Sequence, residues 1–161
     1  MLENFSEIQL LDGLSLWQLE LLKPLFEIYV CPEDTVIFEQ GDEAIYLYLI
    51  LSGSVAVEYK PYDAPMITIT HLKAGNAFGW SAVVGSPAYT SRVRSVEAMD
   101  SIRIRGRDLE RLCMEHPTTG SILLDRLARM VSSRWKNARS QVKSMLRKGM
   151  KTQDLAESAV E

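Results

Sequence analysis

The residues of this sequence that could bind a ligand are concentrated in one glycine-containing segment, 72–90. Gly79 carries no side chain, so the backbone there can approach a bound group closely. The residues that follow, 80–84, can form one helical turn, and the N–H groups of such a turn can point at an anion without help from side chains. Tight turns alone also explain the glycines, whether or not anything binds. The segment predicts a candidate ligand site at four residues: Gly79, Trp80, Ser81 and Ala82.

Other reactive chemistry is sparse. The segment around Ser81 lacks the second glycine of a nucleophile elbow, and no His–Asp pair lies near it in sequence. His71 and His116 are far apart and are the only histidines, which argues against a metal site. Cys31 and Cys113 are also distant and form no CxxC motif, which argues against a disulfide framework or a zinc knuckle. We therefore expect a protein that is not an enzyme and holds no metal.

Composition places the chain among ordinary soluble globular proteins. It has 161 residues, of which 47% are hydrophobic and 24% charged. The longest apolar run, 44–51, is far shorter than the roughly 20 residues of a membrane-spanning helix. The N-terminus carries an acid where a signal peptide would carry bases. A cytoplasmic location is the resulting expectation.

Hydrophobic periodicity predicts a mainly β protein with helices at both ends. The first 25 residues indicate helix, with Ser15 and Gln18 as a capping box and Pro24 near the end. Between 26 and 105, short strands alternate with turn signals at intervals of roughly 8–12 residues. This pattern predicts an antiparallel β-roll or jelly roll. The expected strands are 26–30, 35–39, 46–51, 55–59, 66–72, 90–98 and 101–105.

A long helix is expected from about Gly120 to Lys148, after a short helix that ends near His116. Along it, apolar residues keep an a/d heptad spacing, which predicts a parallel dimer. The predicted seam is Leu124, Ala128, Val131, Trp135, Ala138, Val142 and Met145. A second apolar line, 123, 127 and 130, flanks only the first half, so a helix packed solely on its own domain explains that half alone. We expect three parts: a β-roll with N-terminal helices (1–118), a dimerisation helix (119–149) and a flexible tail (150–161).

The net charge of −3 hides an uneven distribution. Residues 1–125 carry 18 acids and 9 bases, whereas 126–151 carry 9 bases and no acid. The acidic body can neutralise the first half of this basic helix. The second half could instead bind an acidic protein, a nucleic acid or an anionic membrane.

Two stretches resemble the cyclic-nucleotide-binding domain, the family of the catabolite activator protein and of the regulatory subunit of protein kinase A. They are Gly41-Asp-Glu-Ala-Ile-Tyr-Leu-Tyr-Leu-Ile-Leu-Ser-Gly-Ser-Val-Ala-Val57 and Leu72-Lys-Ala-Gly-Asn-Ala-Phe-Gly79. The resemblance covers roughly residues 10–135. It implies that the second stretch opens a phosphate-binding cassette, with a cyclic nucleotide as the possible ligand.

The side chains of the cassette depart from that family. Where the family places a glutamate for the ribose hydroxyl, this chain has Trp80. Tyr89 stands at the position of the phosphate-binding arginine, and Thr90 at that of the small hydroxyl residue. Arg92 or Arg94 could substitute for the missing arginine, but strand alternation places both on the face opposite Tyr89, where we expect solvated surface residues. Tight binding of cyclic AMP is therefore not expected, because losing an ionic contact to a buried phosphate costs several kcal/mol.

The family also covers its ligand with residues of the long helix, and Ser133, Arg134 and Trp135 match those positions. Trp135 could stack on a planar ligand or serve only as a large side chain in the dimer seam. Catabolite-activator relatives continue into a helix-turn-helix domain, which the 12 residues of 150–161 cannot form, so we expect no sequence-specific DNA reading by this chain.

These observations favour a non-enzymatic regulatory or ligand-sensing module with an altered pocket, acting as a homodimer. Its ligand is then a different small molecule or none, and a protein partner is open. Two alternatives remain: a catabolite-activator-type transcription regulator without its DNA-binding domain in this chain, and a ligand-free dimerisation adaptor.

Overall fold

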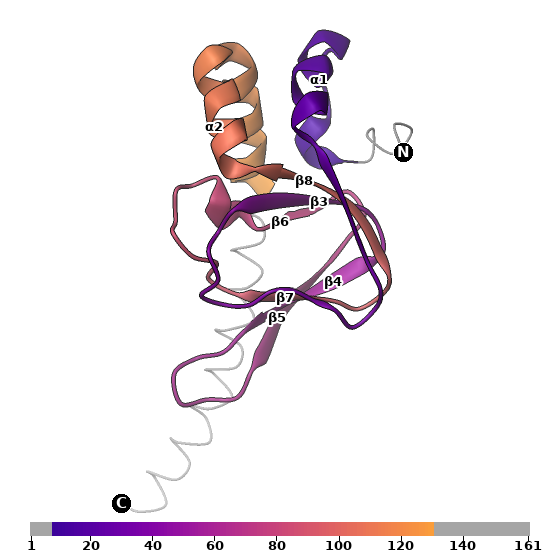
Figure 1. Cartoon of the computed structure of the whole chain (residues 1–161), viewed down its shortest axis with the longest axis vertical. Helices are drawn as coiled ribbons and strands as arrows, with labels where there is room; N and C mark the ends of the chain where they lie inside the picture. The colour runs from indigo at the N-terminus through magenta and orange to yellow at the C-terminus, as the bar shows by residue number, and fades with distance from the viewer. Residues whose placement is uncertain (1–7, 131–161) are drawn as a thin grey trace, which may run out of the picture.

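Two antiparallel four-stranded sheets and a layer of helices make up the fold (Figure 1). The computed structural model describes residues 8–130. The first sheet has the order β1-β8-β3-β6, with β1 (Glu27–Cys31), β8 (Met99–Arg105), β3 (Tyr46–Ser52) and β6 (Ala77–Phe78). The second has the order β2-β7-β4-β5, with β2 (Val36–Phe38), β7 (Arg92–Ser95), β4 (Ser54–Tyr59) and β5 (Ile67–Lys73). The predicted antiparallel jelly roll is confirmed.

Helices cover the outer face of the first sheet. Helix α1 (Leu16–Leu22) and helix α2 (Gly106–Glu115) stand side by side there, and a further helix follows over 117–130 (Figure 1). The predicted capping box starts α1: the Gln18 amide donates to Ser15 Oγ at 3.2 Å, and the Ser15 amide donates to Gln18 Oε1 at 3.0 Å. Short 3₁₀ turns, η2 (Gln9–Leu11) and η3 (Lys23–Leu25), flank α1, so the predicted N-terminal helix is shorter than expected.

Strand β3 contributes side chains to two hydrophobic cores, one beneath the helices and one between the sheets. Its odd-numbered leucines, Leu47 and Leu49 among them, pack against the helices. The alternate residues, Tyr48 and Ile50, point between the two sheets. A strand that is buried on both faces must be apolar at every position, which accounts for the longest apolar run of the sequence. The inner core is rich in aromatic rings, and it is this core that surrounds the candidate site.

Element boundaries differ from the sequence prediction at two places. The expected strand 90–98 is reduced to β7, which ends at Ser95, because the Val96 and Glu97 amides that follow both donate to the Ser54 carbonyl. The Ser95 side chain meanwhile binds the β1–β2 turn: its hydroxyl donates to the Pro32 carbonyl at 2.7 Å and accepts from the Thr35 amide at 2.8 Å. The last described helix begins at residue 117 and not at Gly120. Pro117 occupies its first turn, where a missing N–H costs nothing. Residues 131–148 of the expected long helix lie outside the described residues.

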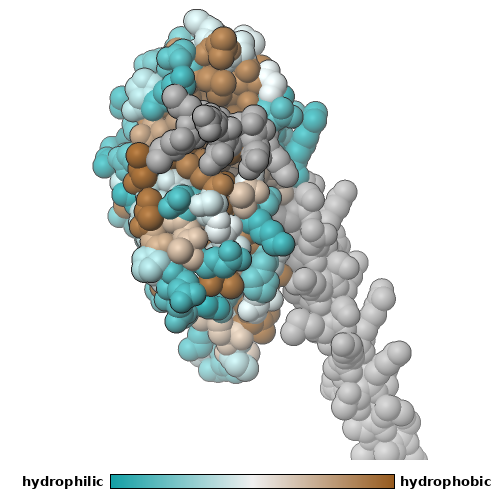
Figure 2. Space-filling view, turned by 90° about the vertical axis from the view of Figure 1, so that its right-hand side faces the viewer, coloured by the Kyte–Doolittle hydropathy of each residue, from teal (hydrophilic) through white to brown (hydrophobic). Residues whose placement is uncertain are grey.

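Apolar side chains also reach the surface. Leu16 and Trp17 on α1, and Ile28 and Val30 on β1, are each at least 60% exposed. Figure 2 shows hydrophobic groups among hydrophilic ones on this side of the molecule, at the upper end, where Figure 1 places the helices, and further down the domain as well. None of the helices within residues 8–130 combines the length and the hydropathy that crossing a membrane requires.

Candidate functional site

The predicted turn after Gly79 is present as the 3₁₀ turn η4 (Trp80–Ala82). Gly79 has a φ of +81°, and a Cβ there would lie 2.7 Å from the Tyr46 carbonyl oxygen, so both backbone conformation and space require glycine. The amides of Ala82 and Val83 donate to the carbonyls of Gly79 and Trp80, at 3.2 and 2.9 Å. These two N–H groups are therefore used within the turn, not presented to an anion.

The turn is anchored to the helical layer on its outer side. The Trp80 ring is half-buried and packs against the core beneath the helices, while Ser81 is buried. A Cβ on Gly106, the first residue of α2, would collide with the Ala82 carbonyl oxygen. The turn and the start of α2 are thus in direct backbone contact.

Tyr89 fills the inner side of the same site. Its side chain is buried, and its ring stacks on Phe38 with centroids 3.6 Å apart and planes 11° from parallel. The hydroxyl donates to the Tyr46 carbonyl at 2.6 Å and accepts from the Tyr46 amide at 2.9 Å. Burial raises the pKa of Tyr89 to about 12, so the phenol is neutral at physiological pH.

Little space remains between Tyr89 and the turn. A cavity of about 20 Å³ is left there, which is room for one water molecule. Ligand pockets for molecules of nucleotide size are typically 300 Å³ or more. The cavity is lined by Phe38, Val57, Phe78, Gly79, Trp80, Ser81, Tyr89, Thr90, Ser91 and Val93. The structure thus brings together the predicted residues Gly79, Trp80, Ser81, Tyr89 and Thr90, but around a nearly filled space.

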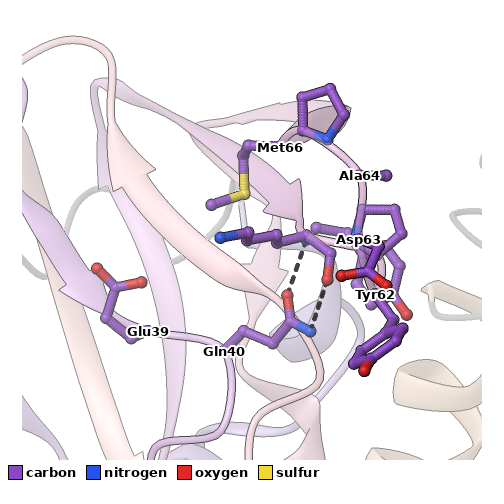
Figure 3. A pocket seen from close by; sticks show the side chains of 10 residues that line it. Glu39, Gln40, Tyr62, Asp63, Ala64 and Met66 are labelled. Carbon is purple, nitrogen blue, oxygen red and sulfur yellow. Dashed lines mark hydrogen bonds between the residues drawn. The ribbon is translucent and has the colours of Figure 1, made fainter.

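The larger hollow of the described chain lies elsewhere, beside the β4–β5 loop (Figure 3). It is an open groove of about 890 Å³ between the segment after β2 and residues 59–66. The Gln40 side chain fastens one wall to the other: its Nε2 donates to the Lys60 carbonyl at 3.2 Å, and its Oε1 accepts from the Lys60 amide at 2.9 Å. Glu39, Lys60 and Asp63 give this groove charges of both signs, and no single ligand chemistry is favoured there.

Arg92 and Arg94 lie on the outer face of the second sheet, opposite the side that Tyr89 occupies, as predicted. They are not solvated surface residues, however, and that part of the prediction is wrong. Both side chains are about a quarter exposed and share the buried Glu58, whose Oε1 lies 3.1 Å from Arg94 Nε and 3.5 Å from Arg92 Nε. Strand pairing places Glu58 opposite Arg92, so the ion pairs hold neighbouring strands together.

A further cationic group, Arg103 on β8, packs against aromatic rings and was missed in the sequence analysis. The Arg103 guanidinium lies over the Tyr46 ring, 3.9 Å from its centroid, and 5.1 Å from that of Tyr29. Its Nε donates to Glu27 Oε2 at 3.2 Å. Arg103 is therefore held by contacts within its own chain, to tyrosine rings that are far from it in sequence.

Tyr48 belongs to the same group of aromatic residues. It stacks on Phe78 with centroids 4.8 Å apart, and burial raises its pKa.

The arrangement of a two-sheet roll, a glycine-led turn between β6 and β7, and helices packed behind it is matched by a known family. The model of the cyclic nucleotide-binding domain matches residues 30–116. The chain belongs to the cyclic nucleotide-binding domain family. No curated protein sequence matches it.

Solved cyclic nucleotide-binding domains share this fold. A putative cyclic nucleotide-binding protein from Geobacter metallireducens is 25% identical, with a TM-score of 0.72 over 83% of this chain and 96% of the other. A cyclic nucleotide-binding domain from Methylobacillus flagellatus is 23% identical, with a TM-score of 0.78 over 89% and 81%. The regulatory subunit of a cAMP-independent protein kinase A from Trypanosoma brucei is 19% identical, with a TM-score of 0.73 over 89% and 50%.

In this cyclic nucleotide-binding domain the start of the predicted dimer seam can be placed. Leu124 and Ala128 are exposed on the helix 117–130, whereas Leu123 and Leu127 of the second apolar line are buried against the domain. The other predicted seam residues lie outside the described residues, as do the expected ligand-covering residues Arg134 and Trp135. The described helix thus has one apolar line that faces its own domain and one that faces solvent.

Proposed function

We propose that this chain is a non-enzymatic regulatory module of the cyclic nucleotide-binding domain family whose cassette does not hold cyclic AMP tightly. The observation that carries the proposal is the buried, doubly hydrogen-bonded Tyr89, at the place where the family resemblance calls for a phosphate-binding arginine.

Two physical reasons support the proposal. First, a cyclic phosphate brought to this site would meet a neutral phenol, so the charge-assisted hydrogen bonds that stabilise a buried anion would be missing. Second, the Tyr89 ring and its Phe38 partner leave about 20 Å³, so a nucleotide could enter only after Tyr89 leaves its stack. Trp80 removes a further contact, since an indole cannot accept a hydrogen bond from the ribose hydroxyl as a carboxylate would.

One of the similar structures offers a parallel. The Trypanosoma brucei regulatory subunit belongs to a kinase described as cAMP-independent, and a triple variant of that subunit, one of whose changes introduces an arginine, is described as bound to cAMP. This parallel supports testing whether an introduced arginine gives cyclic AMP binding in this chain as well.

Calorimetry with a panel of cyclic mono- and dinucleotides tests the proposal. We expect no submicromolar binding of cyclic AMP to the wild-type chain. The double variant Trp80→Glu/Tyr89→Arg should bind more tightly than its parent, and the same pair with Tyr89→Lys serves as a control for charge without the planar guanidinium. Submicromolar binding by the wild-type chain, or no gain in the double variant, would contradict the proposal.

We also propose that the module acts as a homodimer through the helix that begins at residue 117. Of the three parts expected from the sequence, residues 119–149 are the proposed dimerisation helix. The exposed Leu124 and Ala128 support this, because a line of apolar residues on a solvent-facing helix side is unfavourable unless a second helix covers it. Leu124→Asp should shift the chain toward monomers in analytical ultracentrifugation. Arg129→Asp, an exposed change on the same helix but away from the Leu124–Ala128 line, should leave the oligomeric state unaltered. A wild-type chain that is monomeric at tens of micromolar would refute the dimer.

A further inference from the structure

The position of Tyr89 has a meaning beyond the loss of an arginine. Its hydroxyl donates to one backbone group of Tyr46 and accepts from another, so a single atom satisfies both polar groups of that residue. Its ring fills the slot beside Phe38 in a stacked arrangement. A ring that stacks and a polar group that binds the backbone are together the contacts that a small planar ligand would make in this place.

The backbone around Tyr89 is closed in the same way. The Gly41 amide donates to the Tyr89 carbonyl, and the Tyr89 amide donates to the Asp42 carbonyl, both at 2.8 Å. The Ala44 amide donates to the Pro87 carbonyl at 3.1 Å. The loop that carries Tyr89 is therefore joined to the segment before β3 by three backbone hydrogen bonds as well as by the phenol.

We propose that Tyr89 is a built-in occupant of the cassette: it makes within the chain the contacts that a ligand would make, and so holds the cassette in one closed conformation without any small molecule. This inference rests on the proposed function and specifies how the site is regulated. The closed turn is in backbone contact with the start of α2 through Ala82 and Gly106, so the position of α2 is fixed at the same time. A module closed in this way does not respond to the cellular concentration of a cyclic nucleotide.

Replacing the occupant by a free molecule tests the inference. Tyr89→Ala removes a phenol-sized group from a buried slot, and such cavities bind small molecules that match their shape. We expect phenol to raise the melting temperature of Tyr89→Ala, and benzene, which lacks the hydroxyl for Tyr46, to raise it less. At a phenol concentration ten times its Kd, the unfolding equilibrium should shift about tenfold.

The wild-type chain and Tyr62→Ala are the controls. Tyr62 is 95% exposed, so its removal opens no slot, and neither protein should respond to phenol. A folded Tyr89→Ala that responds to phenol no more than these controls would overturn the inference.

Tyr89→Phe provides a second measurement if the alanine variant does not fold. It keeps the ring and removes only the hydroxyl, so the Tyr46 amide loses its acceptor. We expect hydrogen exchange at that amide to become about five- to tenfold faster, with Tyr62→Phe unchanged. Equal exchange at Tyr46 in the wild type and Tyr89→Phe would overturn the inference.

The two proposals can fail separately. If the wild type binds no cyclic nucleotide but phenol and amide exchange give negative results, the proposed function stands and the built-in occupant does not. If the wild type binds cyclic AMP at submicromolar concentration, the proposed function fails. In that case, faster exchange at the Tyr46 amide on binding would show that the ligand displaces Tyr89, and unchanged exchange would overturn the inference too.

Discussion

Raising the pH should weaken the fold through Tyr89. Its pKa is about 12 in the folded chain, against 10.0 for an unperturbed tyrosine. Between these two values the folded state retains a proton that the unfolded state releases, so stability falls as pH rises. The contribution is fully present below pH 10 and is lost by about pH 12.

The size of the effect follows from the shift. One pKa unit corresponds to about 1.4 kcal/mol, so the wild type should lose about 3 kcal/mol through this group across the interval. Tyr89→Phe cannot ionise here and lacks this loss. Below pH 10 the variant should be the less stable protein by about 1–3 kcal/mol, because both polar groups of Tyr46 lose a hydrogen-bond partner. The two stability curves should therefore converge toward pH 12.

Urea unfolding followed by circular dichroism at successive pH values measures both curves. Burial also raises the pKa of Tyr29 and Tyr48, but these groups are present in both proteins and cancel in the difference. Tyr62→Phe, at an exposed position, should follow the wild type throughout. A difference between wild type and Tyr89→Phe that stays constant up to pH 12 would refute the assignment of a buried, neutral, hydrogen-bonded phenol.

Three further predictions concern stability alone, and urea unfolding measures each. Gly79→Ala should cost at least about 1 kcal/mol more than Gly85→Ala: both glycines have a φ of +81°, but only at Gly79 would the new Cβ meet a backbone atom, the Tyr46 carbonyl oxygen, and equal losses would contradict the close contact. Glu58→Gln should cost about 1–3 kcal/mol, because two half-buried guanidinium groups lose their shared carboxylate; a neutral effect would mean that the pairs are solvated. Ser15→Ala should cost about 1 kcal/mol through loss of the cap of α1, and an unchanged unfolding midpoint would argue against the capping box.

Much of the fold could be predicted because its signals are local. Alternation identified the strands, and the spacing of Ser15 and Gln18 identified the start of α1. The glycine-led turn was also predicted correctly, because the positive φ at position 79 favours glycine, which is visible in the sequence. The end of β7 could not be predicted in this way, because it depends on contacts with distant residues: the Val96 and Glu97 amides donate to the Ser54 carbonyl, and the Ser95 hydroxyl binds a turn about sixty positions earlier.

The parts of the site that escaped prediction depend on contacts between distant segments. Arg103 looks like any strand arginine until β1 and β3 bring Tyr29 and Tyr46 to it. Glu58 alternates with Val57 and so resembles a solvent-facing residue. Only the pairing of β4 with β7 shows that Arg92 lies opposite Glu58, where the carboxylate is covered. A correct prediction that β4 pairs with β7 would have indicated the ion pairs from the sequence.

The burial of β3 on both faces has a consequence for folding during synthesis of the chain. Its apolar run is the kind of segment that aggregates when it is exposed as an unpaired strand. In the folded domain β3 is protected in the interior of the sheet between β8 and β6, and its main partner, β8, is synthesised long after it. A nascent chain therefore exposes an unpaired, aggregation-prone strand until Arg105 has left the ribosome. Fragments that end before β8 should accumulate in inclusion bodies, and truncation of this domain should be planned only downstream of that strand.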